Sequence, residues 1–317
     1  MRSRRTTQSR RVRGTFSSKE FLCVLCGSAL IIANSIAAYG QTPPKFDSNR
    51  AWEHLRQLVA IGPRPSGSAA IEQSRKYIKD QLAAIGLKAV EQAWDDETPL
   101  GRVHMVNLIA TIPGTSTNRI AITGHYDTKL FRDIRFVGAS DGGSSAAFLI
   151  ELARVLKARK NALTIEIVFL DGEEAVVEWR GTDHTYGSRH YVEAARRGNT
   201  LASLKAMILV DMIGDRDLGI RRDSNSTGWL TDIVWNAAAR LKLNNYFLPA
   251  STTIEDDHLP FIAAGVPSVD IIDLDYSAWH TKADTLDAVS ARSLQVVGDV
   301  LLAALPQIEA RVARPTA

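Results

Sequence analysis

The sequence predicts a single α/β domain with a central, mixed and mostly parallel β-sheet that is covered by helices on both faces. Two observations carry this prediction. Apolar runs typical of buried strands, such as residues 165–170, alternate with helical patterns along most of the chain. In addition, 45% of the 317 residues are hydrophobic and no repeat or low-complexity tract interrupts the sequence, so the chain can form one large core.

The domain is expected to begin with two helices. Residues 51–61 and 69–86 have helical character, and apolar residues between Ile71 and Ile85 approximate one face of the second helix. The Gly- and Pro-rich residues 62–67 separate the two helices as a polar loop. Both helices are therefore interpreted as structural elements.

The following elements alternate between strand and helix. We expect strands at residues 103–112, 119–124, 163–170, 206–212 and 267–272. We expect helices at residues 144–158, 187–197, 228–241 and 290–309. Because parallel strands are connected through helices that cover the sheet, this order indicates a largely parallel sheet.

The N-terminal residues 1–40 are predicted to be a signal peptide or a membrane anchor. A basic opening runs into an apolar stretch at 21–38 that ends in small residues, so export with cleavage after Gly40 is expected. If it stays uncleaved, a stretch of this length could just span a bilayer and would attach the protein to a membrane. Residues 41–50 are expected to be a linker and residues 51–317 the catalytic domain.

The charge distribution argues against nucleic-acid binding, and the cysteine content argues against disulfides and thiolate chemistry. The formal net charge of +3 is concentrated before the apolar stretch, so the remaining chain is slightly acidic and nucleic acid is not expected as a partner. Both cysteines, Cys23 and Cys26, lie within the apolar stretch, so the chain after Gly40 has neither disulfides nor thiolate chemistry. Metal ligands must then be His, Asp or Glu.

Candidate catalytic residues lie at or beyond the carboxyl ends of four predicted strands. They are His125, Asp127, Asp171, Glu173, Glu174, Asp211 and His280, and Asp141 lies in the string Ser140-Asp141-Gly142 before the helix predicted at 144–158. Open α/β sheets bind their ligands at this edge. Neutral imidazole and carboxylate oxygens are the ligands that zinc accepts, and a catalytic zinc keeps one position open. The sequence therefore predicts a zinc enzyme.

The adjacent carboxylates Glu173 and Glu174 indicate two different roles. Like charges side by side repel and raise one of the two pKa values. A cation relieves the repulsion if one carboxylate binds it, which leaves the other free to move a proton near neutral pH. The pair is interpreted as a ligand next to a base. Asp127, two residues after His125, is expected to orient that imidazole from behind rather than to bind metal.

Five motifs carry a resemblance to a known family. They are His125-Tyr126-Asp127-Thr128-Lys129, Asp171-Gly172-Glu173-Glu174-Ala175, Tyr186-Gly187-Ser188-Arg189, Asp256-Asp257-His258-Leu259-Pro260-Phe261 and Trp279-His280-Thr281. With them, residues 47–310 resemble the zinc exopeptidase family, which contains bacterial leucyl aminopeptidases and animal-type glutaminyl-peptide cyclotransferases. The finer motifs are similar to the cyclotransferase branch. The resemblance implies the α/β sandwich of zinc aminopeptidases.

The resemblance also implies which residues bind metal. In the cyclotransferase branch a single zinc is held by the positions that match Asp141, Glu174 and His280. In the aminopeptidases two zincs are held, and the second uses the positions that match His125 and Asp211. Glu173 matches the base in both branches.

The implied reaction is the cyclisation of an N-terminal glutamine of a peptide or protein. The α-amine attacks the side-chain amide carbon and ammonia leaves, while zinc polarises the carbonyl and Glu173 acts as general acid and base. Asp211 and Asp256 match two acids that form a hydrogen-bonded network with this base. The implied substrate-binding residues are Trp179, Ile254, Glu255, Tyr276 and Trp279.

Two positions depart from the animal enzymes. Glu255 stands where these usually have a glutamine that contacts the substrate amine, and Asp270 stands where they have a histidine near the pocket. A carboxylate at Glu255 could strengthen the binding of a protonated amine but would lower its nucleophilicity.

Three functions are compatible with these residues. A single-zinc cyclotransferase is favoured, because Trp179 and the motif around Asp256 speak against a peptidase. A dinuclear zinc aminopeptidase is the alternative, since His125 and Asp211 permit a second zinc. A non-catalytic binding module on the same fold is the third, although the base and every ligand position are retained.

Overall fold

The computed structural model describes residues 45–313, which fold as one unit. The predicted signal or anchor at residues 1–40 and the first part of the predicted linker at 41–50 lie outside the described residues. Helix α2 (Ser48–Ile61) begins inside that linker, because the carboxylate of Asp47 caps it by accepting a backbone N–H of the first turn. Within the described range, no helix is both long and apolar enough to cross a membrane.

Six strands form the central sheet, in the order β1-β2-β4-β3-β5-β8. They are β1 (Ala89–Thr98), β2 (Gly101–Ile112), β3 (Ser116–His125), β4 (Leu163–Leu170), β5 (Leu204–Asp211) and β8 (Ser268–Ile272). Strands β4, β3, β5 and β8 pair in parallel. Strand β2 pairs antiparallel with β4 and with the edge strand β1. The mixed, mostly parallel sheet predicted from the sequence is confirmed.

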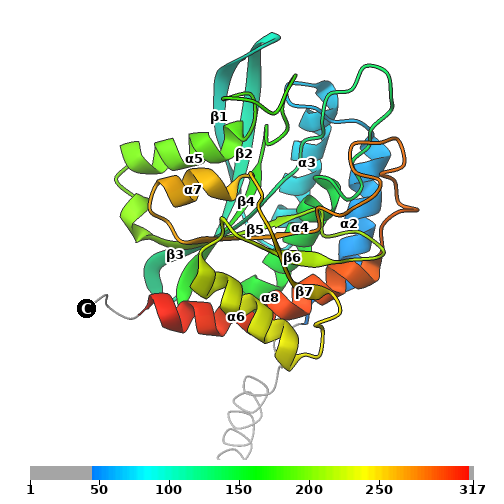
Figure 1. Ribbon diagram of the computed structural model, residues 1–317. Helices are drawn as coiled ribbons and strands as arrows, with labels where there is room; N and C mark the ends of the chain where they lie inside the picture. Colours follow the sequence, from blue (N-terminus) through cyan, green and yellow to red (C-terminus); the bar gives the residue numbers. More distant parts are fainter. Residues whose placement is uncertain (1–44, 314–317) are drawn as a thin grey trace, which may run out of the picture. The chain divides into compact units, whose positions relative to one another are not determined.

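Helices cover both faces of this sheet (Figure 1). Besides α2 they are α3 (Ala69–Ala84), α4 (Gly143–Ala158), α5 (Tyr186–Arg197), α6 (Gly228–Arg240), α7 (His258–Ala263) and α8 (Ala291–Val312). Buried apolar residues of α2, α3, α4, α6 and α8 form the larger core on one face. Helices α5 and α7 cover the other face, where Tyr191 and Phe261 pack against Leu209 and other strand residues. Helices on both faces were expected and are confirmed.

Besides the short 3₁₀ helix η1 (Leu201–Ser203), four elements were not expected from the sequence, namely β1, α7 and the strands β6 (Ile220–Asp223) and β7 (Phe247–Thr252). The last two form a separate two-stranded parallel sheet. Strand β1 lies at the sheet edge with none of its residues buried, so polar residues are tolerated along it, and it is formed by pairing with β2 over its whole length. The other three are too short to produce a clear hydrophobic period.

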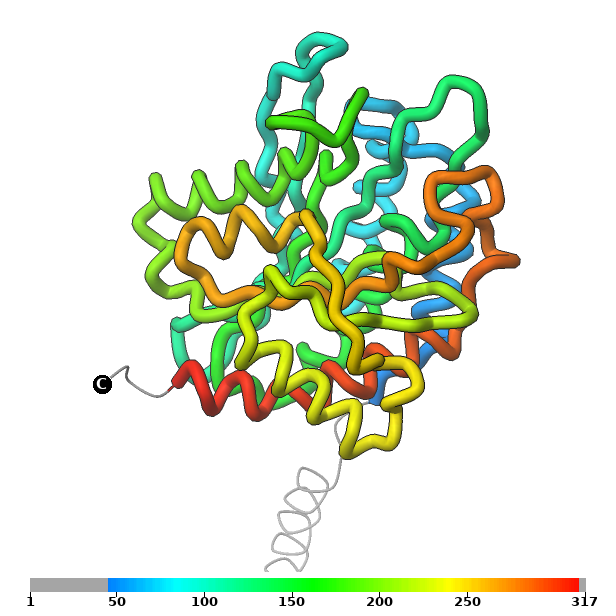
Figure 2. Tube along the Cα trace, viewed as in Figure 1, coloured from blue at the N-terminus to red at the C-terminus, as the bar shows by residue number. Residues whose placement is uncertain are grey.

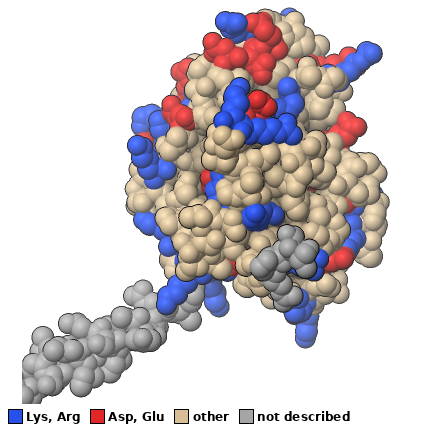
Figure 3. Space-filling model, turned by 90° about the vertical axis from the view of Figure 1, so that its left-hand side faces the viewer, with Lys and Arg blue, Asp and Glu red and all other residues tan. Residues whose placement is uncertain are grey.

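Charged side chains are mixed on the side of the molecule that carries α5 and α7. Figure 3 views this side, and its basic side chains lie beside acidic and neutral ones. The expectation that nucleic acid is not a partner stays a prediction.

Candidate active site

The candidate catalytic residues meet at the carboxyl edge of the parallel strands. His125 is the last residue of β3 and Asp211 the last residue of β5. Glu173 and Glu174 lie in the turn that follows β4, and His280 lies in the loop that follows β8. Asp141 lies directly before helix α4. Parallel strands end at the same edge of a sheet, which is why residues far apart in the sequence converge here.

The first cluster consists of Asp141, Glu174 and His280. Nε2 of His280 lies 3.3 Å from Oδ2 of Asp141 and 3.3 Å from Oε1 of Glu174. Tetrahedral zinc with bonds of about 2.0–2.1 Å places its ligand atoms about 3.3 Å apart. Oδ2 of Asp141 is buried and has no hydrogen-bond partner among the described residues, as expected for an atom that binds a cation. The three residues therefore fit a metal ion.

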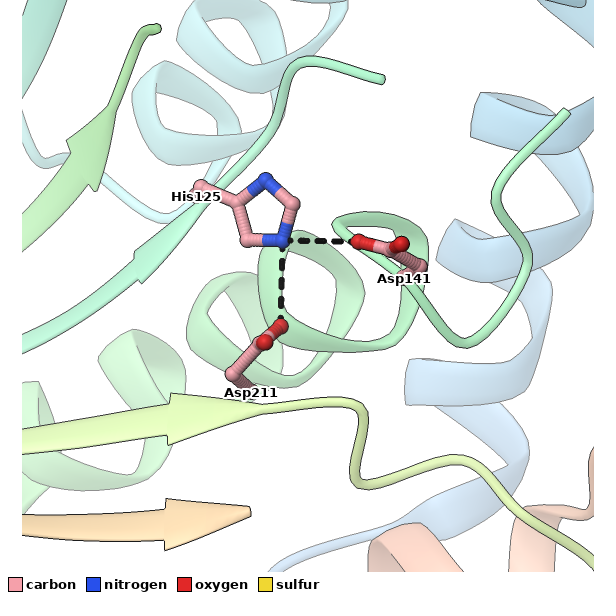
Figure 4. Close-up of side chains that lie close together, drawn as sticks. All are labelled: His125, Asp141 and Asp211. Atoms are coloured by element: carbon pink, nitrogen blue, oxygen red, sulfur yellow. Dashed lines mark hydrogen bonds and ion pairs between the residues drawn. The ribbon is translucent and has the colours of Figure 1, made fainter. Parts of the chain in front are cut away.

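The second cluster consists of His125, Asp141 and Asp211 (Figure 4). Nε2 of His125 lies 3.2 Å from Oδ1 of Asp141 and 3.0 Å from Oδ1 of Asp211. This arrangement also satisfies the spacing of a metal site. However, Oδ1 of Asp211 accepts the backbone N–H of Met212 at 2.7 Å and the hydroxyl of Ser145 at 3.4 Å as well. Protein donors thus bond to a candidate ligand oxygen here, as the backbone N–H of Lys129 does to Oε1 of Glu174 in the first cluster at 3.1 Å.

Asp127 lies behind the site and connects its parts. Its Oδ1 lies 3.3 Å from Nδ1 of His125 and accepts the backbone N–H of Glu173 at 3.3 Å. Its Oδ2 accepts the backbone N–H of Glu174 at 3.3 Å. One buried carboxylate therefore fixes both the imidazole and the turn with the two glutamates, in the orienting position expected from the sequence.

Glu173 is the carboxylate best placed to exchange protons. Its Oε2 lies 3.7 Å from Nδ1 of His125, and the side chain lines the pocket described below. Burial raises the pKa of Glu173 well above the usual carboxyl range; the charge of His125 opposes this rise, while Asp256 and Glu174 add to it. A carboxyl group with a raised pKa can both accept and return a proton near neutral pH.

A pocket of about 490 Å³ opens above the metal cluster. Among the predicted catalytic residues, Glu173, Asp211 and Asp256 line it. Among the predicted substrate-binding residues, Trp179, Ile254, Glu255 and Trp279 line it. The sequence did not reveal that Ile272 and Leu274 form part of the wall, because strand β8 and the loop after it carry no motif at these positions.

Tyr276 is the one predicted substrate-binding residue that the structure does not bring to the pocket. It is buried, and its hydroxyl donates to Oδ1 of Asp284 at 2.7 Å. Asp284 also accepts the backbone N–H groups of Ser140 at 2.7 Å and Asp141 at 3.1 Å. Figure 2 shows these two segments, the green one after β3 and the orange one after β8, side by side. Through Asp284, Tyr276 thus helps to hold the loop that carries the candidate metal ligand Asp141.

The two tryptophans at the pocket are held by stacking on histidines. Trp179 stacks on His184 with ring centroids 4.2 Å apart, and Trp279 stacks on His280 with centroids 4.5 Å apart. Their exposed fractions are 36% and 43%, so each ring keeps a free face. Such half-exposed aromatic walls suit a small ligand that must lose water on binding. Sequence alone did not assign this contact to His184.

Gly142 has to be a glycine for the site to form. Its φ is 74°, in the left-handed region. A Cβ at this position would lie 2.4 Å from the carbonyl oxygen of Asp127 and 2.9 Å from Cε1 of His125. The absent side chain lets the segment with Asp141 approach the end of β3.

Arg64, in the Gly- and Pro-rich loop before α3, is fully buried behind the site. Its guanidinium donates to the carbonyl oxygens of Tyr126 at 2.9 Å, Val137 at 2.6 Å and Gly138 at 3.0 Å. The first acceptor lies at the start of the segment that connects His125 to Asp141, and the other two lie near its end. The sequence predicted only a polar loop here. Arg64 contacts backbone carbonyl oxygens, which every residue has, so no sequence pattern reveals these contacts.

We therefore expect Arg64→Met to lower the free energy of unfolding by about 3 kcal/mol or more, since three buried acceptors lose their donor. Denaturant unfolding measures this change, and metal affinity is expected to fall with it. Arg56→Met is the matched control, because Arg56 is about half-exposed and pairs with Glu53 on the helix surface. Equal effects of the two substitutions would contradict the role given to Arg64.

Comparisons with known proteins agree with this geometry. Residues 107–305 match Peptidase family M28. The glutaminyl-peptide cyclotransferase-like protein of Mus musculus is 30% identical over 76% of this chain and 70% of its own length. The crystal structure of a glutaminyl cyclase from an Acidobacteriales bacterium superposes with a TM-score of 0.82 at 41% identity, covering 86% of this chain and 97% of that one. A leucine aminopeptidase precursor from Bacteroides thetaiotaomicron superposes with a TM-score of 0.77 at 26% identity, covering 83% and 98%. The chain belongs to Peptidase family M28.

Proposed function

We propose that this chain is a zinc-dependent glutaminyl-peptide cyclotransferase, which converts N-terminal glutaminyl residues of peptides or proteins to pyroglutamate and releases ammonia. The observation that carries this proposal is a single pocket in which two tryptophans and Ile254 surround Glu173 and the metal cluster. The named glutaminyl cyclases among the relatives and structural neighbours support it, whereas the aminopeptidase alternative has less support.

Asp141, Glu174 and His280 would hold the metal, which we propose to be one zinc ion per chain. A bound zinc supplies a Lewis acid that polarises the side-chain amide carbonyl of the substrate. We favour one zinc because the relatives and structural neighbours named glutaminyl cyclases support the branch for which a single zinc is expected.

Glu173 moves the proton in this proposal. The α-amine of the substrate forms a bond to the side-chain amide carbon, and the bond from that carbon to the amide nitrogen breaks. Glu173 takes the proton that the amine loses and delivers it to the departing nitrogen, which leaves as ammonia. Water competes with the amine for the reacting carbon, and a bound glutaminyl side chain between the aromatic walls would exclude it.

Asp211 and Asp256, which line the pocket together with Glu173, would support this cycle in two different ways. Asp211 orients His125, which faces Glu173. Oδ2 of Asp256 is buried without a hydrogen-bond partner among the described residues. A buried carboxyl that lines the pocket is available to donate to an oxygen of the substrate when it carries a proton.

Trp179 is expected to contribute to substrate binding more than to the chemical step. We expect Trp179→Ala to raise KM for a glutaminyl dipeptide by about tenfold with a smaller change in kcat, because an aromatic wall is lost and the base stays in place. Trp94→Ala is the control, since Trp94 also stacks on a histidine, His190, but lies on β1 away from the pocket. A fall in kcat with unchanged KM would contradict the assignment.

Ammonia release tests the proposed reaction. Purified protein is incubated with a glutaminyl dipeptide, its N-acetylated form and the corresponding asparaginyl dipeptide. We expect ammonia from the first alone, because the reaction needs a free amine and a side chain long enough to close the ring. Ammonia from the N-acetylated peptide would indicate simple amide hydrolysis and would contradict the proposal.

A dinuclear aminopeptidase is the second candidate, and the cluster of His125, Asp141 and Asp211 is the observation in its favour. We also propose that the chain is exported or membrane-anchored through residues 1–40, which lie outside the described residues. N-terminal sequencing of the protein recovered from fractionated cells tests this, and recovery of the uncleaved chain from the cytoplasm would contradict it.

A further inference from the structure

The loop between β4 and α5, residues 173–185, forms one side of the pocket and is called the wall loop below. Backbone hydrogen bonds close it at its base. The N–H of Thr185 donates to the carbonyl oxygen of Glu173 at 2.8 Å, and the N–H of Tyr186 donates to the carbonyl oxygen of Gly172 at 2.7 Å. Thr185 has a φ of 48°, in the left-handed region that residues other than glycine rarely adopt. Such a backbone persists only where its surroundings hold it.

Asp183 lies within the wall loop and accepts four hydrogen bonds. Its Oδ1 accepts the backbone N–H of Val176 at 3.0 Å and the hydroxyl of Tyr186 at 2.8 Å. Its Oδ2 accepts the backbone N–H of Val177 at 2.9 Å and that of Glu178 at 2.9 Å. The side chain of Asp183 is buried. One carboxylate thus holds the amides of three consecutive residues.

These donors also keep Asp183 ionised. Burial would raise its pKa, but the hydrogen bonds from the backbone of Glu178, the hydroxyl of Tyr186 and the other two amides hold the pKa of Asp183 below the usual carboxyl range. A carboxylate accepts stronger hydrogen bonds than a neutral oxygen does. The wall loop is therefore held by charge-assisted bonds at neutral pH.

The residues that Asp183 holds lead directly to the aromatic wall of the pocket. Val177, Glu178 and Trp179 all line the pocket. The side chains of Val177 and Trp179 are 54% and 36% exposed, so packing alone does not hold this segment. His184, on which Trp179 stacks, is the residue after Asp183. The backbone before Trp179 and the ring beneath it are thus both fixed next to this carboxylate.

We propose that Asp183 is a positioning residue, which sets the place of Trp179 at the pocket by holding the backbone of residues 176–178. Asp183 itself does not line the pocket, so it acts on a bound ligand through the wall loop. The consequence for substrate binding rests on the proposed cyclotransferase function.

Asp183→Asn tests this role with a side chain of nearly the same shape. It replaces one acceptor oxygen with an NH₂ group, which only donates. In either orientation of the amide, at least one backbone N–H of residues 176–178 then faces a donor and loses its acceptor. Two measurements follow: hydrogen–deuterium exchange of peptides that cover residues 174–182, and KM and kcat for a glutaminyl dipeptide.

Glu309→Gln is the matched control. Glu309 is also a buried carboxylate that accepts backbone N–H groups, those of Ala162 at 2.9 Å and Leu163 at 3.4 Å. These amides lie at the opposite end of β4, away from the pocket. The control therefore reports what the loss of a buried carboxylate does to the fold in general.

Asp183→Asn is expected to speed exchange at residues 176–178 by about tenfold or more and to raise KM by about fivefold, with less than a twofold change in kcat. Glu309→Gln is expected to lower the denaturant midpoint but to leave KM and this exchange unchanged. Equal changes of KM in the two variants would overturn the inference, because the effect would then come from general loss of stability.

A double-mutant cycle with Trp179→Ala tests whether Asp183 acts through Trp179. If it does, Asp183→Asn has little left to disturb once the indole is gone. KM of the double variant is then expected to lie within about twofold of KM for Trp179→Ala alone. A KM raised by the product of the two single effects would show independent roles and would overturn the inference.

Asp183→Glu decides the matter if Asp183→Asn does not fold. Glutamate keeps the charge and both acceptor oxygens, but its longer side chain cannot keep all the amide contacts of residues 176–178 at their present distances. Faster exchange and a raised KM are expected, and an unchanged KM despite faster exchange would overturn the inference. A wild-type protein that releases no ammonia would contradict the proposed function instead, while the exchange measurements, which need no substrate, still decide whether Asp183 holds the wall loop.

Discussion

Glu173→Gln is expected to lower kcat for cyclisation of a glutaminyl dipeptide by about 10³-fold, within the range found for loss of a general acid–base group. Glutamine has nearly the same shape and keeps the turn after β4, so the pocket and the metal cluster remain, but its amide cannot accept the proton of the amine. KM and zinc content are therefore expected to change little. Steady-state ammonia release and metal analysis measure the three quantities.

The control for this substitution is Glu193→Gln, which removes an exposed carboxylate on α5 away from the pocket. It is expected to leave kcat unchanged. If Glu173→Gln retained more than about a tenth of the wild-type kcat, a group other than Glu173 would have to move the proton.

The second large effect concerns the metal ligands. His280→Ala removes one of three ligands, so zinc content at fixed free zinc is expected to fall close to zero and cyclisation to fall by about 10²-fold or more. His125→Gln is the informative partner, because glutamine can still donate to Asp211 but is a poor zinc ligand. It is expected to leave about one zinc per chain, whereas a fall from two zincs to one would support the dinuclear alternative.

Much of the fold could be predicted because buried strands and amphipathic helices have distinct hydrophobic periods. The strand at 163–170 was predicted with the bounds that the structure shows, and the helix at 144–158 within one residue of them. Strand β1 could not be predicted in this way, because its position at the sheet edge leaves polar residues exposed on it. Edge pairing is a tertiary property that the local pattern does not contain.

The convergence of the candidate site residues was predictable for a related reason. Residues placed directly after parallel strands, such as His125 and Glu174, must meet at one edge of the sheet. Contacts to backbone atoms were not predictable, since any residue offers the same carbonyl oxygens, and Arg64 is the clearest case. Tyr276 shows the reverse: the family resemblance implied a pocket residue, but its hydroxyl donates to Asp284 in the supporting loop.

A paired assay on one preparation of the purified protein decides whether this site cyclises glutaminyl peptides or cleaves peptides. Ammonia release from a glutaminyl dipeptide and amine release from a leucyl anilide are measured together with zinc content. We expect ammonia release, no anilide cleavage and about one zinc per chain, with activity lost in Glu173→Gln. Anilide cleavage by a protein with two zincs, without ammonia release, would contradict the proposed function and would make His125 and Asp211 metal ligands.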